Sequence, residues 1–399
     1  MNRREFLFTA AAASAVPALA SAASTPAPTP ATAAKSGPLV RTPVSLMAPR
    51  VDGFEAVWGV NELCLGRIEY EDAAGRRHVA AANSFGFTPQ HDSVLRVRVD
   101  RLQPGQSYRV RAITVSGEDG RTETSAWKTF RTLDASAATT HFVAWNDTHI
   151  HNDTIQRLDD LTPAADFLLW NGDTCNNWTA SDLLVPTLLH PGGRDITARR
   201  PLLFNWGNHD SRGKFGYLTA SIVPTPAGRP FCAFRTGPVA CIMLHSGEDK
   251  PDNHPTFKGR AAFETLLAEE AEWLRAAIRQ PGIADAPYRV VCCHMPLRWI
   301  EEVPADYANK GYDHFCARGR PLWHDSLVAW KTQLVISGHT HRSEAIPATP
   351  DFPYAQLTGG GPNLEQATWI DVDANAARLR VVAHRVAGGI AHELTFPPL

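Results

Sequence analysis

The chain has 399 residues, enough for two domains, and its 44% hydrophobic and 20% charged residues are the balance of an ordinary globular protein. Its formal net charge is −2, so the sequence lacks the excess of basic residues that binding to nucleic acid or to an anionic membrane surface requires. We therefore expect neither partner.

The first 22 residues are predicted to be a cleavable export signal. Arg3 and Arg4 lead into an uncharged, Ala-rich stretch, and small residues offer cleavage after Ala20 or Ala22. Paired arginines are typical of a twin-arginine signal, which the bacterial Tat export machinery recognises. An ordinary Sec signal and a retained anchor are the alternatives. The stretch is short for a membrane span, so we expect a periplasmic or secreted protein without a span in its mature form.

A linker and a small β domain are expected next. Residues 23–38 are rich in Ala, Pro, Thr and Ser, as in a solvated spacer. Residues 39–133 show short alternating β patterns between turn residues and no convincing helix. The turn Leu102–Gly105 and the following Tyr108 are similar to the tyrosine corner of fibronectin type III-like sandwiches. A packing or assembly module is expected, with substrate or glycan binding as the alternative.

One further expectation concerns the basic residues of this domain. They are predicted to share one solvated sheet face: Arg96, Arg98, Arg109 and Arg111.

Residues 139–399 predict an α/β layered fold, because apolar runs alternate with helical stretches. Apolar residues recur at helical spacing over residues 261–280, and the aromatic residues of this helix are expected in the core. Two strands over 367–372 and 378–383 indicate an antiparallel finish to a sheet.

Five short polar motifs each follow an apolar, strand-like run in this region. They are Asp147-Thr148-His149, Gly172-Asp173, Gly207-Asn208-His209-Asp210, His294 and Gly338-His339-Thr340-His341. Ligands gather beyond the carboxyl ends of strands in open α/β sheets. Strands ending together would collect carboxylates, a carboxamide and imidazoles without a thiolate, a set suited to hard or borderline metals. There are enough ligands for two ions that share one carboxylate.

Local spacing adds two expectations. In Asp147-x-His149 a period of two puts both side chains on one side of an extended chain. The glycines at 172, 207 and 338 allow the backbone to bend tightly at strand ends.

The order of these motifs resembles the calcineurin-like metallophosphoesterases, a superfamily that includes the purple acid phosphatases. The matching motifs span residues 147–341. The resemblance implies an α/β fold, a four-layer αββα sandwich, with the small fibronectin type III-like domain in front, as in larger purple acid phosphatases.

The resemblance also implies a ligand set for two metal ions. Metal one takes Asp147, His149, Asp173 and His341, and metal two takes Asp173, Asn208, His294 and His339, so that Asp173 is the bridge. A hydroxide bridging the metals would attack phosphorus, and His209 would face the leaving group as general acid or charge stabiliser. Fe, Zn and Mn all suit this set.

The sequence departs from purple acid phosphatases at two positions. It has Asn176 where they place a metal-binding tyrosine, and His149 where they place a glycine. A purple, tyrosinate-ligated iron site is therefore not expected. Asn176 is expected to hydrogen-bond His209 without supplying the charge that an Asp gives in many other relatives.

Weaker candidates surround these motifs. Arg212, Lys214 and His254 are candidate substrate contacts, and the polar loop 247–254 is a candidate wall of the pocket. His151 and Asp153 are more readily explained as solvated loop residues. Of the seven cysteines, Cys232 and Cys241 flank a predicted hairpin turn, so a bridge between them is conceivable.

The sequence therefore predicts an exported two-metal phosphoesterase that acts on a small phosphomonoester. Phosphodiester hydrolysis, on cyclic nucleotides, glycerophosphodiesters or nucleotides, is the alternative within the same family. A non-catalytic metal- or phosphate-binding surface protein is a third interpretation, disfavoured because the whole ligand set and His209 are present.

Overall fold

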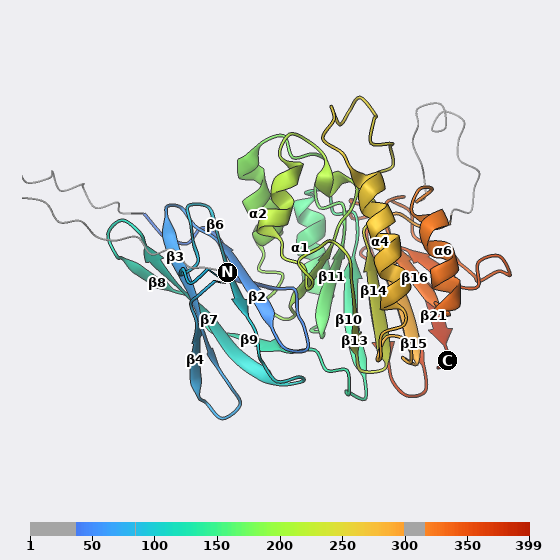
Figure 1. The fold of residues 1–399 in the computed structure, drawn as a ribbon, viewed down its shortest axis with the longest axis horizontal. Coiled ribbons are helices and arrows are strands. Elements are labelled where there is room, and N and C mark those ends of the chain that lie inside the picture. The colour runs from blue at the N-terminus through green and yellow to red at the C-terminus, as the bar shows by residue number, and fades with distance from the viewer. Residues whose placement is uncertain (1–36, 84, 299–315) are drawn as a thin grey trace, which may run out of the picture. The chain divides into compact units, whose positions relative to one another are not determined.

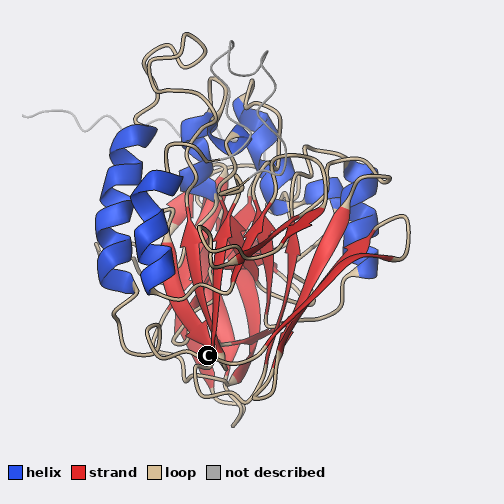
Figure 2. Cartoon of the chain, turned by 90° about the vertical axis from the view of Figure 1, so that its right-hand side faces the viewer, coloured by secondary structure: helices blue, strands red, loops and turns tan. Residues whose placement is uncertain are grey.

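Two β-sheets packed face to face form the centre of the structure, a computed structural model that describes residues 37–83, 85–298 and 316–399 (Figure 1). The export signal predicted for residues 1–22 and nearly all of the predicted linker lie outside these residues. Figure 2 shows helices on both outer sides of the strands. This is the four-layer α/β arrangement that the sequence predicts.

The larger sheet has nine strands, and its central strands β10, β11 and β12 are parallel. Its spatial order is β21 (Ile390–Phe396), β20 (Leu379–Arg385), β19 (Thr368–Ala374), β10 (Thr140–Trp145), β11 (Phe167–Asn171), β12 (Leu202–Asn205), β1 (Ser45–Met47), β2 (Phe54–Gly59) and β6 (Val94–Val99). The antiparallel finish through β19 and β20 is confirmed.

The second sheet has six strands, of which β14, β15, β16 and β18 are parallel. Its order is β13 (Cys232–Thr236), β14 (Val239–Leu244), β15 (Tyr288–Cys293), β16 (Leu334–Ser337), β18 (Ala355–Thr358) and β17 (Glu344–Ile346). Apolar side chains from both sheets, such as Phe142, Phe167 and Leu334, fill the space between them.

Helices cover the outer face of each large sheet. On the nine-stranded side lie α1 (Asn152–Leu161), α2 (Leu184–Leu189) and the short α3 (Thr219–Ile222). On the six-stranded side lie α4 (Phe263–Ala277) and α6 (Arg320–Ala329). None of the helices in the described part of the chain combines the length and apolar character that crossing a bilayer requires.

The predicted helix over 261–280 is therefore found, with shorter ends. Asp252 caps α4 by accepting hydrogen bonds from the backbone N–H groups of Phe263 and Glu264, each at 3.0 Å. Trp273 packs against the core, as expected. The expectation is wrong for Phe263, which is only partly buried because its ring packs on His245 and Phe257 and not in the core.

A smaller sheet packs against β1, β2 and β6. Its order is β4 (Arg77–Ala80), β3 (Cys64–Glu71), β7 (Ser107–Ser116) and β8 (Thr122–Thr124), with β5 (Gln90–His91) on β3 and β9 (Lys128–Arg131) on β7. Residues such as Phe54, Trp58 and Val110 form the core between the two layers. The tyrosine corner is confirmed, since the hydroxyl of Tyr108 accepts a hydrogen bond from Gln103 N–H at 2.9 Å.

The nine-stranded sheet runs through both regions of the chain, a feature that the sequence analysis missed. Strand β1 pairs in parallel with β12, with Met47 opposite Leu202. Without β1, β12 would present unpaired backbone groups at a sheet edge. The division into domains at 39–133 and 139–399 stays a prediction, because β1, β2 and β6 contribute both to the small sandwich and to the large sheet.

One smaller expectation is wrong, and the conceivable bridge between Cys232 and Cys241 is absent. The four arginines do not share one face, because Arg96 and Arg98 lie on β6 whereas Arg109 and Arg111 lie on β7 of the other sheet. All seven cysteines are buried free thiols. Cys232 lies opposite Met243 and Cys241 opposite Phe234, so the register of the hairpin does not pair the two thiols.

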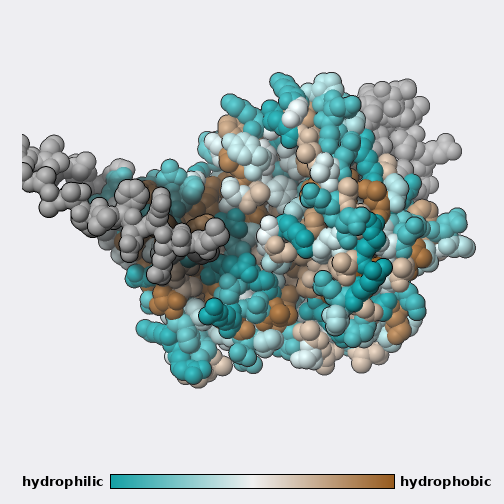
Figure 3. Space-filling model, viewed as in Figure 1, coloured by the Kyte–Doolittle hydropathy of each residue, from teal (hydrophilic) through white to brown (hydrophobic). Residues whose placement is uncertain are grey.

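The exposed surface mixes polar and apolar residues, as Figure 3 shows for one face of the molecule. Single apolar side chains between polar ones are ordinary on a soluble surface and need no partner.

Tyr108→Phe is expected to lower the free energy of unfolding by about 1 kcal/mol, because the N–H of Gln103 loses its acceptor. Urea denaturation measures the change. Tyr70→Phe is the matched control, since its ring lies 6.1 Å from that of Tyr108 and its hydroxyl makes no hydrogen bond in the described part of the chain. Equal destabilisation by both variants would contradict the corner's role.

Candidate metal centre

The five polar motifs meet at one edge of the two central sheets. Each begins at the carboxyl end of a parallel strand: β10, β11 and β12 in one sheet, β15 and β16 in the other. The loops are tied together by backbone hydrogen bonds. The N–H of Asp147 donates to the carbonyl of Gly172 at 3.1 Å, and that of Gly338 donates to the carbonyl of His294 at 2.8 Å. The predicted convergence of strand ends is therefore present.

Six acidic and imidazole side chains form two groups with the spacing of metal ligands. One group consists of Asp147, His149 and His341, and the other of Asp173, His294 and His339. Within each group the possible ligand atoms lie within 4.8 Å of one another. These are the two sets that the sequence assigns to separate ions, apart from Asn208 and the shared Asp173.

Asp173 lies between the two groups. Its Oδ2 is 3.1 Å from Nε2 of His294 in one group and 3.6 Å from Nε2 of His149 in the other. Its Oδ1 accepts a hydrogen bond from the N–H of His209 at 2.9 Å. This position is the one that a bridging carboxylate requires.

Five of the candidate ligands have a left-handed backbone. Their φ angles are 52° at Asp147, 43° at His149, 55° at Asp173, 74° at His339 and 55° at His341. Non-glycine residues rarely adopt this conformation, and such strain is concentrated at functional sites. The expectation of an extended Asp147–His149 segment is therefore wrong: positive φ angles at both residues bring the side chains into the site.

The glycines preceding the motifs are needed for space more than for bending. A Cβ on Gly207 would lie 2.2 Å from Oδ1 of Asp173, and one on Gly338 would lie 2.4 Å from Oδ2 of Asp147. Only Gly172 has a positive φ, 85°. A side chain at any of the three positions would displace a candidate ligand or its supporting backbone.

The contacts among these side chains fit a pair of cations. Nε2 of His149 and Nε2 of His341 lie 3.0 Å apart, and so do Oδ1 of Asn208 and Nδ1 of His339. Two ligand atoms at about 2.1 Å from one ion stand about 3 Å apart in adjacent octahedral positions.

The surroundings of His294 fit a metal ligand as well. Its Nδ1–H donates to the carbonyl of Asn171 at 2.8 Å, so in the neutral ring, the form that binds a metal, the lone pair is on Nε2. That nitrogen is buried and lies 3.1 Å from Oδ2 of Asp173, but it makes no hydrogen bond of good geometry in the part of the chain that the structure describes. A ring fixed through one nitrogen with the other free is the usual arrangement of a ligating histidine.

Burial of two carboxylates creates a demand for positive charge. Asp147 and Asp173 are fully buried, and burial raises the pKa of Asp147 well above its usual range. Burial also opposes ionisation of Asp173, but His294 and His209 hold the pKa of Asp173 well below its usual range. Burial disfavours protonated His294, yet Asp173 and Asp147 raise its pKa to about 10. Bound cations would meet the same demand.

His209 is held from two sides. Its Nδ1–H donates to the main-chain carbonyl of Asn176 at 2.6 Å, and Nη1 of Arg212 lies 2.8 Å from its Nε2. Burial lowers the pKa of His209, and the charge of Arg212 lowers it further. Asn176 therefore orients His209 through its backbone, where the sequence analysis expected its side chain. A contact to the main-chain carbonyl of Asn176 does not depend on the residue type at position 176, so the sequence contains no signal for it.

Arg212 is anchored by carboxylates from the predicted pocket loop. Nη2 lies 2.7 Å from Glu248 and 2.5 Å from Asp249. Glu248 is buried, which raises its pKa to about 7 in spite of Arg212. Residues 248 and 249 of the loop thus hold Arg212 beside His209, so Arg212 supports the site through His209 in this structure.

The other weak candidates lie around the centre. Lys214 is exposed, with Nζ 5.1 Å from the ring of Phe215. The ring of His254 lies 6.3 Å from that of Phe257 in the turn before α4. His151 and Asp153 are exposed at the start of α1, as the solvated-loop interpretation predicts, and they line an open groove of about 790 Å³ that also reaches His149.

Asp210 was missed as a site residue. It is fully buried, and its carboxylate accepts hydrogen bonds from the backbone N–H groups of Asp173, Thr174 and Gly207 at 2.8, 3.0 and 2.8 Å, and from the Thr174 hydroxyl. It therefore fixes two motif loops to each other. The one available signal was that Asp210 directly follows His209 in its motif. The backbone is a 3₁₀ turn here.

A row of buried amides beneath the site was also missed. Asn171 donates to Oδ1 of Asn146 at 2.9 Å, and Asn205 donates to Oδ1 of Asn171 at 2.8 Å. These residues end β11, follow β10 and end β12, so the row links three strand ends. Such a network gives the ligand-bearing loops a rigid base.

Comparisons with known proteins agree with this geometry. The sequence profile of the family described as calcineurin-like phosphoesterase matches residues 140–343, just over half of the chain. No curated protein matches the chain in sequence. The two solved structures described next resemble the fold at 14% sequence identity or less.

Two of these structures cover most of the chain. The purple acid phosphatase PPD1 from yellow lupin (Lupinus luteus) seeds is 14% identical with a TM-score of 0.64, over 89% of this chain and 74% of that chain. PhoD is 11% identical with a TM-score of 0.60, over 89% of this chain and 90% of that chain. At this identity they show a shared fold. The chain belongs to the calcineurin-like phosphoesterase family and is a hydrolase of phosphoric ester bonds.

Asp210→Asn is expected to destabilise the protein by about 2 kcal/mol and to lower its metal content, because an amide presents N–H groups to backbone donors that need acceptors. Thermal unfolding and elemental analysis of the purified protein measure the two effects. Asp325→Asn, on the exposed face of α6, is the control. An Asp210→Asn protein as stable and metal-rich as the control would disprove the role.

Proposed function

We propose that this protein hydrolyses small phosphomonoesters with two metal ions held by Asp147, His149, Asp173, Asn208, His294, His339 and His341. The observation that carries the proposal is the placement of Asp173 between the two ligand groups, near His149 and His294 at once. Asp173 would be the bridge, and the other residues would divide as the two groups do.

The ligand residues would hold two cations at positions where both could contact the phosphoryl group of the substrate. Bound cations would neutralise the phosphoryl oxygens and activate a water as the nucleophile. No side-chain nucleophile is then required. An oxygen- and nitrogen-only set accepts Fe, Zn or Mn, and availability would decide among them.

His209 would face the leaving-group oxygen. The Asn176 carbonyl fixes its Nδ1–H, so Nε2 is the atom that would act at the leaving group. To act as an acid, Nε2 would have to be protonated and separated from Nη1 of Arg212, which lies 2.8 Å away. Arg212, 2.8 Å from that nitrogen, would share the stabilisation of developing negative charge. We therefore propose a general-acid or charge-stabilising role for His209, positioned by Asn176 and Arg212.

A monoester preference is supported by the fold shared with a purple acid phosphatase. Phosphodiester hydrolysis is the second candidate, favoured by one observation. The open groove of about 790 Å³ beside His149 has room for a second ester group. We further propose export through a twin-arginine signal, on the strength of Arg3, Arg4 and the apolar stretch after them.

Metal analysis of the purified mature protein, paired with hydrolysis of p-nitrophenyl phosphate and bis-p-nitrophenyl phosphate, tests the proposal. We expect about two metals per chain and faster hydrolysis of the monoester. Asp173→Asn should lose metal and activity together, because the bridge loses its charge. Preference for the diester would select the second candidate. Absence of hydrolysis of both esters after reconstitution with Fe, Zn and Mn would refute the proposed function.

His209→Ala is expected to keep near-normal metal content while turnover falls. The loss should be on the order of 100-fold for alkyl phosphates and much smaller for p-nitrophenyl phosphate, whose leaving group needs little help. Steady-state rates on a series of leaving groups measure this dependence. Equal losses across the series would exclude an acid or charge-stabilising role at the leaving group.

A further inference from the structure

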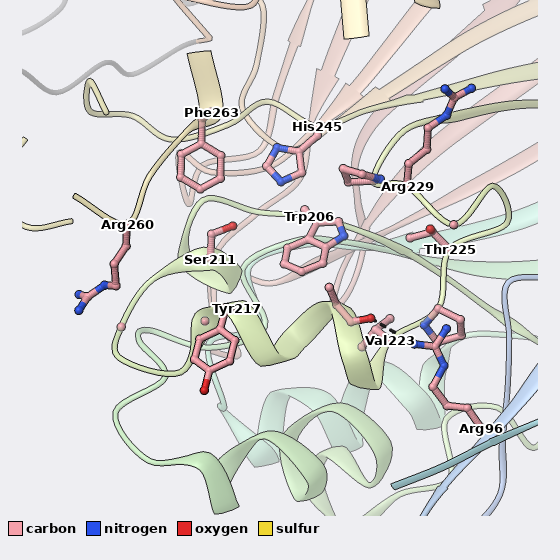
Figure 4. Close-up of a pocket in the computed structure, with 16 residues that line it drawn as sticks. Arg96, Trp206, Ser211, Tyr217, Val223, Thr225, Arg229, His245, Arg260 and Phe263 are labelled. Atoms are coloured by element: carbon pink, nitrogen blue, oxygen red, sulfur yellow. Dashed lines mark hydrogen bonds between the residues drawn. The ribbon is translucent and has the colours of Figure 1, made fainter. Parts of the chain in front are cut away.

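A pocket of about 350 Å³ lies behind the segment that carries Asn208 and His209 (Figure 4). Its walls come from both sides of that segment, from the turn 223–230, and from the region between β14 and α4. Trp206 precedes the segment and Ser211 follows it, whereas none of the candidate metal ligands lines the pocket. The volume suits a small molecule of one or two rings.

Aromatic rings form one wall of the pocket. The ring of His245 lies 5.8 Å from that of Trp206 and 5.8 Å from that of Phe263, stacked on the latter at 19°. In Figure 4, His245 lies between the other two rings, and Tyr217 lies on the opposite side. Tyr217 is 71% exposed, unusual for so large a ring. Flat aromatic walls favour a planar aromatic ligand.

Two N–H donors in this wall lack acceptors. His245 is only 3% exposed, and its Nδ1 accepts a hydrogen bond from Gly247 N–H at 2.9 Å. The proton of the neutral ring is therefore on Nε2, which has no acceptor in the described part of the chain. Nε1 of Trp206 is buried and without a hydrogen-bond partner there, whereas Nε2 of His245 keeps some exposure. A buried donor without a partner costs about 1–3 kcal/mol, so the pocket favours a ligand that carries acceptor oxygens.

The charges around the pocket have one sign. Arg96, Arg229 and Arg260 line it, and none of its described lining residues is Asp or Glu. Arg96 is engaged by Glu55 at 3.0 Å and by the carbonyls of α3. Arg260 is exposed and makes no ion pair within the described residues. An anionic group at the mouth would therefore find an available guanidinium.

We propose that this pocket binds a small planar aromatic acid, with its rings between Trp206, His245 and Tyr217 and its acid group toward Arg260. The site does not require metal ions, because the ligand clusters contribute nothing to its walls. Phe263, which the sequence analysis expected in the core, is half-exposed because it belongs to this wall.

Isothermal titration calorimetry with 2-naphthoate on the full chain tests the proposal. We expect saturable binding, weaker binding of uncharged 2-naphthalenemethanol, and weaker binding of non-aromatic cyclohexanecarboxylate. A carboxylate also has affinity for metal ions, so the titration is repeated with chelator-treated protein and with excess inorganic phosphate. Binding that persists in both supports the pocket. Binding that vanishes in either, or no binding at all, overturns the proposal.

Variants locate the site. Arg260→Ala should weaken 2-naphthoate binding about threefold, because an exposed ion pair contributes about 0.2–1 kcal/mol. Arg378→Ala, an equally exposed arginine beside β20, should change nothing. Trp206→Phe should weaken binding about fivefold, because the smaller ring offers less stacking surface to the ligand. Because Trp206 is buried, that variant is at risk of misfolding, and Ser211→Ala is the second variant. The Ser211 hydroxyl lines the pocket and would donate a hydrogen bond to the ligand's acid group, so its removal should weaken binding about threefold. Unchanged affinity in Arg260→Ala and Ser211→Ala would overturn the assignment.

Discussion

The structure depends on two fully buried carboxylates, Asp147 and Asp173, held side by side where two sheets meet. Taking one unpaired carboxylate out of water is costly, and two within a few ångströms also repel each other. Their opposite pKa shifts express that conflict, and His294 relieves part of it. A fold that keeps both carboxylates in place must supply rigid support and positive charge. The loops around the two carboxylates provide the support, and bound cations would supply the positive charge that His294 alone does not.

The support is a set of contacts between loops, because a single strand end cannot hold a strained backbone by itself. The left-handed residues of the site cost free energy and persist only where their surroundings fix them. Backbone hydrogen bonds between motif loops, the Asp210 carboxylate and the row of buried amides provide that constraint. The glycines at 207 and 338 let two loops approach more closely than any side chain would permit. The same contacts between loops therefore stabilise the strained backbone and fix the positions of the candidate ligands.

The sequence predicted most reliably those features that a continuous stretch of residues determines by itself. Apolar runs predicted the strands of the central sheets, and the residues after them include both ligand groups. It failed where a contact joins distant segments through the backbone or through a turn. The Asn176 carbonyl, the Asp210 carboxylate and the pairing of β1 with β12 leave no periodic pattern. The aromatic pocket was hidden for the same reason, since its walls come from four separate stretches.

The first region shares a sheet and a hydrophobic core with the catalytic region. Its strands β1, β2 and β6 complete the large sheet, and residues such as Met47 and Val57 pack in the same core as Trp145 and Trp170. Arg96 extends from β6 to the carbonyls of Ala220 and Ser221, beside the pocket. Removing this region would expose the edge of β12 and part of the core near the ligand-bearing strand ends. Its strands therefore close the sheet from which the loops with the candidate metal ligands project.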